Sequence, residues 1–316
     1  MSVLVFAENW DGKFKNPSFE AVSYGKAVAD KAGTDLIAVT FGNLEDDASV
    51  LGKYGANKVV HVSDAGAFDA HLYGNSLKDL ANGLSAKVVV VSQSNNGKML
   101  SSFLAVAWEA GMISNVVEAP ESVAPIKVKK KVFSSKGIAT VESSEERVVL
   151  ALASNSFGAH EAATDAAVES GSTSGEAKTQ SVEVDRATGQ ITLSEAEVVV
   201  SAGRGLKGPE NWGMVEELAG LLGAATACSK PVSDVGWRPH TEHVGQTGKA
   251  IAPNLYIAIG ISGAIQHLAG VSSSKVIVVV NSDPEAPFFK AADYGIVGDA
   301  FDVVPRLIEA VKELKG

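Results

Sequence analysis

The chain has few of the features that mark secreted, membrane-spanning or disulfide-stapled proteins. Among its 316 residues there is a single cysteine, Cys228, so no disulfide can form within the chain and a reducing compartment is expected. No apolar run reaches the length that spans a bilayer. The opening stretch MSVLVFAENWDGKF has no basic segment ahead of a long apolar one, and it predicts a first strand rather than a signal peptide. We therefore expect a cytoplasmic protein that is not embedded in a membrane.

An excess of positive charge is also missing. The net charge is −10, with 17 basic and 25 acidic residues in 1–197 and 10 and 12 in 198–316. An acidic chain lacks the basic surface that nucleic acids require, so no nucleic-acid partner is expected. The acidity, concentrated in the N-terminal part, suits a partner with a basic face.

What the chain does contain is a regular alternation of short apolar runs and helical patterns. Its length favours two domains, and its 46% hydrophobic residues supply a core for each. In the first half the expected strands are 3–8, 34–42, 57–63 and 87–94, and the expected helices are 16–33, 44–55, 73–86 and 97–111. Strands that alternate with helices predict a mostly parallel sheet.

The alternation breaks in the middle of the chain and then resumes. Residues 126–133 and 137–143 predict an antiparallel hairpin, 147–153 is apolar, and 154–190 predicts mostly loop with a weak strand near 179–185. Strands are expected again at 197–203, 255–260 and 275–281, with helices at 209–223 and 301–316. We predict an α/β protein of two domains, each a mostly parallel sheet flanked by helices, with the boundary near 186–196 and a smaller, doubly wound second domain.

One glycine motif follows a predicted strand of the second domain. GRGLKG (203–208) matches the dinucleotide fingerprint G-x-G-x-x-G and leads towards a predicted helix. Such a loop brings bare backbone and helical N–H groups to a phosphate. The acidic residue that the fingerprint expects about 20 positions on is missing, so phosphate binding and an ordinary strand–helix turn both remain open.

Two other motifs fail their tests. GQTGK (245–249) is not a phosphate-binding P-loop, because His243 stands where the first glycine belongs and Ala250 stands where Ser or Thr is needed. GISGA (260–264) is not a nucleophile elbow, because Ala264 replaces the last glycine. These failures argue against a hydrolase.

The remaining polar residues of this half offer weaker signals. HTEH (240–243) lacks a third ligand for zinc and predicts a polar loop, whereas His267 lies among Ser262, Gly263 and Gln266 and is open to a functional role. Asn281 and Asp299 follow strand ends, where open α/β sheets bind ligands. With no nucleophile–base pair and no metal-ligand set, these loops suit a large, phosphate-bearing, planar cofactor that carries the chemistry itself.

Four long segments of the second half together resemble the α subunit of electron transfer flavoproteins. They are VVVSAGRGLKGPENW, ACSKPVSDVGW, VGQTGKAIAPNLYIAIGISGAIQHLAG and VNSDPEAPFFKAADYGIVGDAFDVVP, so the resemblance runs almost unbroken from about residue 197 onwards. It implies a nucleotide-hydrolase-like N-terminal α/β domain (1–190) that contacts a β subunit, and a C-terminal FAD-binding domain (191–316).

The resemblance also implies a function. Such a protein is a heterodimeric electron carrier, not an enzyme with its own substrate; it holds one FAD mainly in the α subunit, and an AMP in the partner β subunit. It would take single electrons from flavin dehydrogenases, such as the acyl-CoA dehydrogenases of fatty acid β-oxidation. It would pass them to a membrane electron transfer flavoprotein–quinone oxidoreductase.

The residues that the resemblance assigns to FAD fall into groups along the cofactor. Arg204 and Ser229, with Lys230 beside them, would lie along the phosphate and ribityl side; Val244, Gly245, Gln246 and Thr247 beside the isoalloxazine; Ser262, Gly263, Ala264, Ile265, Gln266 and His267 around the ribityl chain, the pyrophosphate and the pyrimidine edge; Asn281 at the diphosphate or ribose; and Asp299 and Ala300 at the adenine end.

Three of these residues would tune the flavin. One-electron reduced flavin carries negative charge near N1 and the C2 carbonyl, where a donor such as His267 would stabilise it, while Thr247 would act at the N5 edge. Many family members have Arg where this chain has Lys230, and lysine keeps the charge but loses the planar guanidinium. We expect a shifted flavin potential as a result.

Other interpretations stay open. Within the family, an electron-bifurcating form would carry a second FAD in the β subunit and oxidise NADH. From other classes, the chain would be a nucleotide-binding regulatory module without redox work, or a hydrolase. If the protein is a shuttle, we expect its second domain to swing about the segment near 186–196 so that two partners can reach the flavin.

Overall fold

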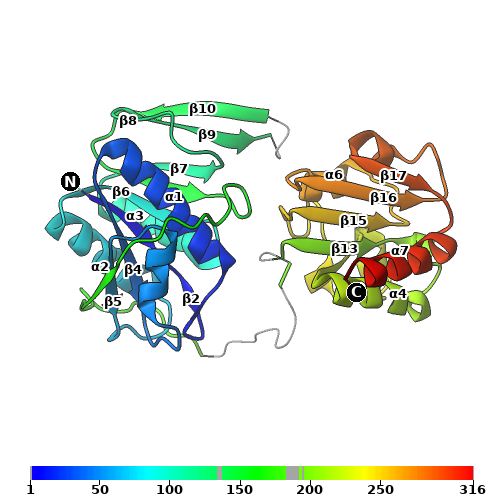
Figure 1. Cartoon of the computed structure of the whole chain (residues 1–316), viewed down its shortest axis with the longest axis horizontal. Helices are drawn as coiled ribbons and strands as arrows, with labels where there is room; N and C mark the ends of the chain where they lie inside the picture. Colours follow the sequence, from blue (N-terminus) through cyan, green and yellow to red (C-terminus); the bar gives the residue numbers. More distant parts are fainter. Residues whose placement is uncertain (1, 134–136, 183–191, 194–195, 316) are drawn as a thin grey trace. The chain divides into compact units, whose positions relative to one another are not determined.

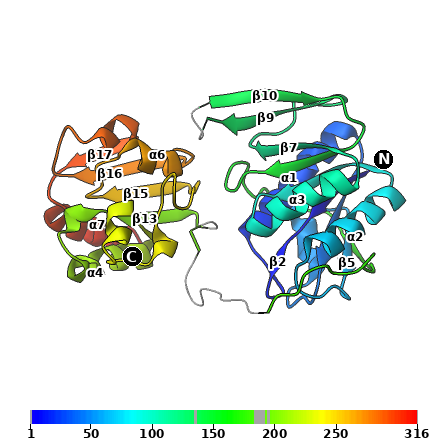
Figure 2. The same cartoon turned by 180° about the vertical axis from the view of Figure 1, so that it is seen from behind.

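The computed structural model of the chain describes all residues except 1, 134–136, 183–191, 194–195 and 316. It divides into two compact units, the first made of residues 1–132 and 137–185 and the second mainly of residues 186–316 (Figures 1 and 2). Each unit is α/β, with a mostly parallel sheet between helices, which confirms the predicted fold class. Most of the predicted boundary segment, 186–196, lies outside the described residues.

The first unit is built on a ten-stranded sheet. Its parallel part runs in the order β7-β11-β6-β1-β4-β5-β12, and β9, β10 and β8 form an antiparallel edge that confirms the predicted hairpin. The strands are β1 (Ser2–Phe6), β4 (Asp35–Phe41), β5 (Lys58–Val62), β6 (Ala86–Ser92), β7 (Gly111–Val116), β8 (Ser122–Val123), β9 (Ile126–Val132), β10 (Gly137–Ser143), β11 (Val148–Leu152) and β12 (Ala167–Ser170), and a separate small hairpin joins β2 (Asn9–Trp10) to β3 (Lys13–Phe14).

Helices cover both faces of this sheet. The helix α1 (Asn16–Ala32) and the 3-10 helix η1 (Ala48–Tyr54) pack on one face, and α2 (Ala70–Gly83) and α3 (Asn95–Ala107) pack on the other. All five residues of β1 and of β11 are buried, which is why these segments are continuous apolar runs in the sequence. Ser94 caps α3, and Gly33, in the left-handed conformation, ends α1.

Two elements of the first unit differ from the prediction. The helix expected over 44–55 is the shorter 3-10 helix η1, because the Asp47 side chain caps its start by accepting a hydrogen bond from the Ser49 N–H and Gly55, in the left-handed conformation, ends it. The stretch expected to be mainly loop contains β12, which pairs in parallel with β5. All four residues of β12 are exposed, so no apolar alternation marks it in the sequence.

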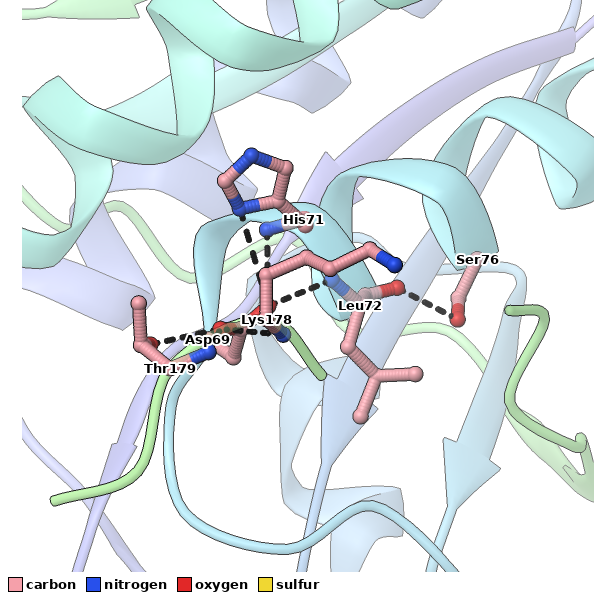
Figure 3. Close-up of polar contacts among 6 residues, drawn as sticks. All are labelled: Asp69, His71, Leu72, Ser76, Lys178 and Thr179. Atoms are coloured by element: carbon pink, nitrogen blue, oxygen red, sulfur yellow. Dashed lines mark hydrogen bonds and ion pairs between the residues drawn. The ribbon is translucent and has the colours of Figure 1, made fainter. Parts of the chain in front are cut away.

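A buried carboxylate fastens the end of the first unit to the start of α2. Asp69 is 2% exposed, and its Oδ1 accepts hydrogen bonds from the backbone N–H groups of His71 (2.9 Å) and Leu72 (2.8 Å). Its Oδ2 accepts from the backbone N–H groups of Lys178 (3.1 Å) and Thr179 (2.8 Å) and from the Thr179 hydroxyl (2.6 Å), as Figure 3 shows. The contact joins residues more than 100 positions apart in the chain.

This contact explains why the weak strand predicted near 179–185 is wrong where it can be checked. Residues 179–182 form no strand, because the N–H groups of Lys178 and Thr179 bond to Asp69 instead of to a neighbouring strand; residues 183–185 lie outside the described residues. Burial raises the pKa of Asp69, but the hydrogen bonds from Thr179, Leu72 and Lys178 outweigh it and hold the pKa at about 2.

The second unit is a five-stranded parallel sheet in the order β14-β13-β15-β16-β17. One face packs against α6 and η5, and the other packs against α4, α5 and α7. The bounds are β13 (Val198–Ala202), β14 (Ala225–Cys228), β15 (Leu255–Ile259), β16 (Val276–Asn281), β17 (Tyr294–Val297), α4 (Gly213–Leu222), α5 (Lys230–Asp234), α6 (Ile265–Val271), α7 (Ala300–Lys315), η2 (Arg204–Leu206), η3 (Pro209–Asn211), η4 (His240–Glu242) and η5 (Pro287–Ala291). The unit is doubly wound, as predicted. No helix in the described parts of either unit combines the length and apolar character that crossing a bilayer requires.

Candidate cofactor-binding site

The winding of the second sheet reverses between β13 and β15. From β13 the chain adds β14 on one side, then crosses to the other side and adds β15, β16 and β17 in turn. At such a reversal the loops that follow two neighbouring strands diverge, and open α/β sheets bind ligands in the crevice this leaves at the carboxyl ends of the strands. The loops in question begin at Gly203, Ser229 and Gly260.

A cavity of about 480 Å³ lies at this reversal. The volume falls in the range of small-molecule and cofactor sites. Eleven of the residues predicted for the site line it together: Arg204, Ser229, Lys230, Val244, Gly245, Gln246, Thr247, Ser262, Ala264, Gln266 and His267. Loops that are distant in sequence therefore converge on one cavity, and cofactor binding by these residues stays a prediction.

Five predicted residues are not among the described residues that line the cavity. Ile265 is exposed at the start of α6, and Gly263 packs against Phe288, where a Cβ atom would lie 2.5 Å from the Phe288 Cβ. Asn281 donates a hydrogen bond from Nδ2 to the Ile261 carbonyl (2.9 Å) and so supports the cavity wall from behind.

The last two predicted residues lie at the start of α7. Asp299 accepts a hydrogen bond from the Phe301 N–H (3.0 Å) and lies 3.5 Å from Lys207 Nζ, while Ala300 is buried. The hydrogen bond from Phe301 lowers the pKa of Asp299. If an extended cofactor reaches these two residues, it has to leave the cavity to do so.

The glycines of GRGLKG have a packing role that the sequence does not reveal. A Cβ atom at Gly203 would lie 2.3 Å from the Gly260 carbonyl oxygen, and one at Gly205 would lie 2.6 Å from the Gly260 Cα. The two loops also share a hydrogen bond from the Gly205 N–H to the Gly260 carbonyl (3.1 Å). Close approach of two backbones, which only glycine allows, holds the two sides of the crevice in place.

The expectation that GRGLKG leads into a helix is only partly right. Two short 3-10 turns, η2 and η3, follow it, and α4 does not begin until Gly213. Lys207 adopts a left-handed conformation (φ 65°) that interrupts any continuous helix. No long helix therefore starts at the motif, and the dinucleotide fingerprint does not apply in its usual form.

The segment Val244–Thr247 follows η4 in the chain and forms a turn that is hydrogen-bonded to β14 on one side and to α6 on the other. The Val244 N–H donates to the Cys228 carbonyl (3.1 Å), and the Gln246 N–H donates to the Gln266 carbonyl (2.7 Å). Gly245, with φ 151°, fits where a side chain would meet the Gln266 carbonyl oxygen at 3.1 Å. Gln246 and Thr247 are exposed on the cavity wall, so their polar groups are available to a ligand.

His267 is buried in the cavity wall. It is 7% exposed, its Nε2 lies 2.8 Å from the Tyr256 hydroxyl, and its ring meets Phe288 edge-on with ring centroids 5.7 Å apart. Burial and the neighbouring His243 lower the pKa of His267 to about 4, against an opposing interaction with the Val244 backbone. The imidazole is therefore neutral at pH 7, so its donor is a neutral N–H and not an imidazolium.

His243 is a site residue that the sequence did not suggest. HTEH was expected to be a polar loop, but only its first part is exposed; His243 is 1% exposed and lines the cavity. Burial, then His240, lower the pKa of His243. Its position directly before Val244 is the one signal that could have pointed to it. Among the described residues there is no group of three His, Cys, Asp or Glu that could hold a metal ion.

Two buried nitrogens make the site fit a polar ligand. Nδ1 of His243 and Nδ1 of His267 form no hydrogen bond of ordinary geometry with any described residue. A buried imidazole nitrogen without a hydrogen-bond partner costs about 1–3 kcal/mol, so water or a ligand has to supply that partner.

Four further residues that line the cavity were not predicted from the sequence: Pro231, Asp234, Gly260 and Ile261.

The fold and the cavity together define a class. This is an α/β protein whose second, doubly wound unit offers a glycine-framed cavity at its winding reversal. The family signature "Electron transfer flavoprotein FAD-binding domain" matches residues 192–272, and the "Electron transfer flavoprotein domain" signature matches residues 3–186. The chain belongs to the electron transfer flavoprotein family and is similar throughout to its α subunits.

Curated relatives match over almost the whole length. The electron transfer flavoprotein subunit alpha of Bacillus subtilis is 37% identical over 99% of this chain and 98% of its own. That of Pseudomonas aeruginosa is 38% identical over 98% of this chain and 100% of its own. Protein FixB of Clostridium saccharobutylicum is 34% identical over 99% of this chain and 96% of its own.

Proposed function

We propose that this chain is the α subunit of a heterodimeric electron transfer flavoprotein and binds FAD in the cavity at the β13–β15 reversal. Such a protein carries single electrons from flavin dehydrogenases, acyl-CoA dehydrogenases among them, to a membrane quinone oxidoreductase. The observation that carries the proposal is the convergence on one cavity of eleven residues that the resemblance assigns to FAD, beside two buried imidazole nitrogens that form no hydrogen bond of ordinary geometry with any described residue. Bound FAD would supply the one-electron redox chemistry; the chain's own residues would bind and tune it.

The cationic and hydroxyl groups of the cavity suit the phosphate and ribityl parts of FAD. Arg204 and Lys230 are the basic residues of the cavity wall, and the Ser229 and Ser262 hydroxyls accompany them. Arginine offers a bidentate fork to phosphate oxygens, whereas lysine offers a point charge. Asn281, Asp299 and Ala300 remain assigned to the diphosphate and adenine end as a proposal.

Two groups of the wall would tune the flavin ring from opposite edges. We assign the Thr247 hydroxyl to the N5 edge and His267 to the N1 and C2 carbonyl edge. The Tyr256 hydroxyl has His267 Nε2 as its partner, and if it donates there, the proton of the neutral imidazole lies on Nδ1. The imidazole then presents an N–H donor without a full positive charge, which stabilises negative charge on the ring by its dipole.

The test uses the chain co-expressed with its β subunit. We expect the purified heterodimer to show a flavin visible spectrum and to accept electrons one at a time during anaerobic stepwise reduction. A Gly260→Val variant is the negative control. The backbone angle φ is 61° at Gly260, and a Cβ atom there would lie 2.8 Å from the Gly205 Cα. A colourless wild-type heterodimer that takes up no added FAD would contradict the proposal and favour a nucleotide-binding module without redox work.

The ratio of FAD to heterodimer separates the two types within the family. One FAD with one AMP per heterodimer supports the shuttle. Two FAD molecules together with NADH oxidation would favour the electron-bifurcating alternative, which places the second FAD in the β subunit.

A further inference from the structure

Two of the six histidines of the chain, His243 and His267, line the cavity, and a third, His240, lies beside His243. His240, on η4, is exposed, and its Nδ1 lies 3.1 Å from the Ser233 hydroxyl oxygen. The His240 and His243 ring centroids are 5.2 Å apart, and the buried His243 lines the cavity. The pair therefore forms a line of titratable rings from solvent to the cofactor cavity.

Two glycines bring backbone close to the His243 ring. A Cβ atom at Gly248 would lie 2.8 Å from Nδ1, and one at Gly245 would lie 3.5 Å from Nε2. Glycine at both positions lets the turn close over the imidazole. The His243 backbone itself forms a β-bridge with Cys228. Because the buried ring also lines the cavity, charge placed in the cavity acts on its titration at short range.

The charges that face His243 come from three elements. Lys230 and Asp234 lie on α5, His240 lies on η4 and His267 lies on α6, while the adjacent Glu242 is held by Arg238 at 2.6 and 2.8 Å. Burial, His240 and Lys230 lower the pKa of His243, and Asp234 raises it. His243 is thus neutral in the resting cavity, and negative charge placed in the cavity would oppose Lys230 and raise the pKa.

We propose that His243 takes up a proton from solvent, by way of His240, when the bound cofactor gains an electron. The inference rests on the proposed function. An electron enters from an external reductant, a reduced flavin dehydrogenase or dithionite in a test. A proton leaves the solvent and binds an unprotonated ring nitrogen of His243, and the net charge of the cavity stays constant. No bond to the cofactor forms or breaks.

His267 is less suited to this role. Its Nε2 already lies at hydrogen-bond distance from Tyr256, its ring packs against Phe288, and burial lowers its pKa to about 4. His267 also has no exposed imidazole beside it, whereas His243 has His240. In this arrangement His267 would orient a donor and His243 would exchange the proton.

The thermodynamic test measures the one-electron potential of the heterodimer as a function of pH. If one proton follows each electron, the potential falls by about 59 mV per pH unit. We expect this slope in the wild type over part of the range from about pH 6 to 9, and a flat profile in His243→Asn, which keeps a polar ring-sized group but cannot take a proton. His267→Asn is expected to shift the potential and keep the slope.

The kinetic test separates His240 from His243. Proton uptake during dithionite reduction, followed by a pH-indicator dye in weak buffer, is expected to slow several-fold in His240→Asn while the equilibrium slope remains. His71→Asn is the control, because His71 is a half-exposed histidine of the first unit and neither the slope nor the rate should change.

Each outcome decides the proposal. A His243→Asn protein that retains the slope, or a slope lost only in His267→Asn, overturns it while leaving FAD binding intact; a wild type without FAD defeats the proposed function itself. If His243→Asn does not assemble, ¹³C-histidine spectra of the wild type take its place. One buried imidazole, other than the one lost in His267→Asn, must become protonated on full reduction, and its absence overturns the proposal.

Discussion

The two sheets of this chain end differently at the place where each reverses its winding. In the first unit the reversal lies between β1 and β6, and Glu8, just after β1, fills it. Glu8 is 5% exposed, and its carboxylate accepts hydrogen bonds from the Ser94 hydroxyl (2.5 Å) and the Asn96 amide (2.8 Å). In the second unit three glycines, Gly203, Gly205 and Gly260, line the same position and leave a cavity beside them.

The difference shows that topology supplies a possible site and local residues decide whether it is open. At the reversal of the first unit a negative side chain satisfies the polar groups that face it, so a phosphate there would meet a carboxylate. In the second unit Nδ1 of His243 and Nδ1 of His267 form no hydrogen bond of ordinary geometry with any described residue, and basic side chains line the wall. A doubly wound sheet is therefore a scaffold, and its function is set by a few positions at one edge.

The largest expected effect comes from closing the open reversal. Gly203→Val places a Cβ atom within 2.3 Å of the Gly260 carbonyl oxygen. We expect a packing penalty of about 1–3 kcal/mol and a loss of FAD affinity of about tenfold or more, measured by thermal unfolding and FAD titration of the heterodimer. Gly220→Ala in α4, where the added Cβ atom would meet no atom within 4 Å beyond the adjacent backbone of its own helix, is the control and should stabilise by about 0.4–1 kcal/mol. Normal FAD content in Gly203→Val would show that the glycine contact is not needed.

The second prediction concerns the β1–β6 reversal of the first unit, where the Glu8 side chain would be removed. Glu8→Ala removes the acceptor of the Ser94 and Asn96 hydrogen bonds and should destabilise the first unit by about 1.5–3 kcal/mol, without changing the flavin spectrum. Glu161→Ala, an exposed glutamate of the same unit, is the matched control for loss of one negative charge. Should Glu8→Ala also release FAD, the two reversals are not independent and the comparison fails.

A third prediction concerns Asp69, the buried carboxylate that joins the start of α2 to Lys178 and Thr179 in the first unit. Because the pKa of Asp69 is depressed from 3.8 to about 2, its contribution to stability is full above pH 4 and is lost as the pH falls towards 2. Asp69→Ala should cost about 2 kcal/mol at neutral pH and speed amide exchange at Lys178 and Thr179. Asp79→Ala, which removes an exposed carboxylate bonded to Ser174, should do much less. Unchanged exchange at Thr179 in Asp69→Ala would show that Asp69 does not hold this segment.

The smallest expected effect sharpens the charge side of the comparison. Lys230→Arg in the cavity wall adds a planar fork where the chain has a point charge, so it should raise the one-electron flavin potential by about 20–60 mV, at most tenfold in the equilibrium. Lys249→Arg, an exposed lysine just after the same turn, should leave it unchanged. Identical potentials in wild type and Lys230→Arg would sink the idea that lysine sets the potential here.

Most of the helices and strands could be predicted because their signals lie in neighbouring residues of the sequence. Buried parallel strands such as β1, β6 and β16 are short apolar runs, and Gly33 marks the C-terminal end of α1 in the sequence. The failures have non-local causes. The exposed edge strand β12 carries no apolar pattern, and the segment at Thr179 is held by Asp69, which no local pattern connects to it.

The candidate site divides in the same way. Its loops were predictable from their density of glycine and polar residues beside strand ends, and eleven of the sixteen proposed residues do meet at one cavity. His243 was missed because HTEH has the composition of a polar loop, and only the packing of Gly245 and Gly248 against the ring shows it to be buried. The displacement of Gly263 and Asn281 behind the wall was equally invisible.

By itself, the sequence determined the alternation of strands and helices, the two-unit α/β plan and the family, because periodicity and motif spacing are properties of neighbouring residues. Only the tertiary structure decided which reversal is open, which imidazoles are buried and which glycines serve backbone packing rather than phosphate contact. Burial, hydrogen-bond satisfaction and pKa depend on groups from distant parts of the chain, and only the tertiary fold brings these groups together.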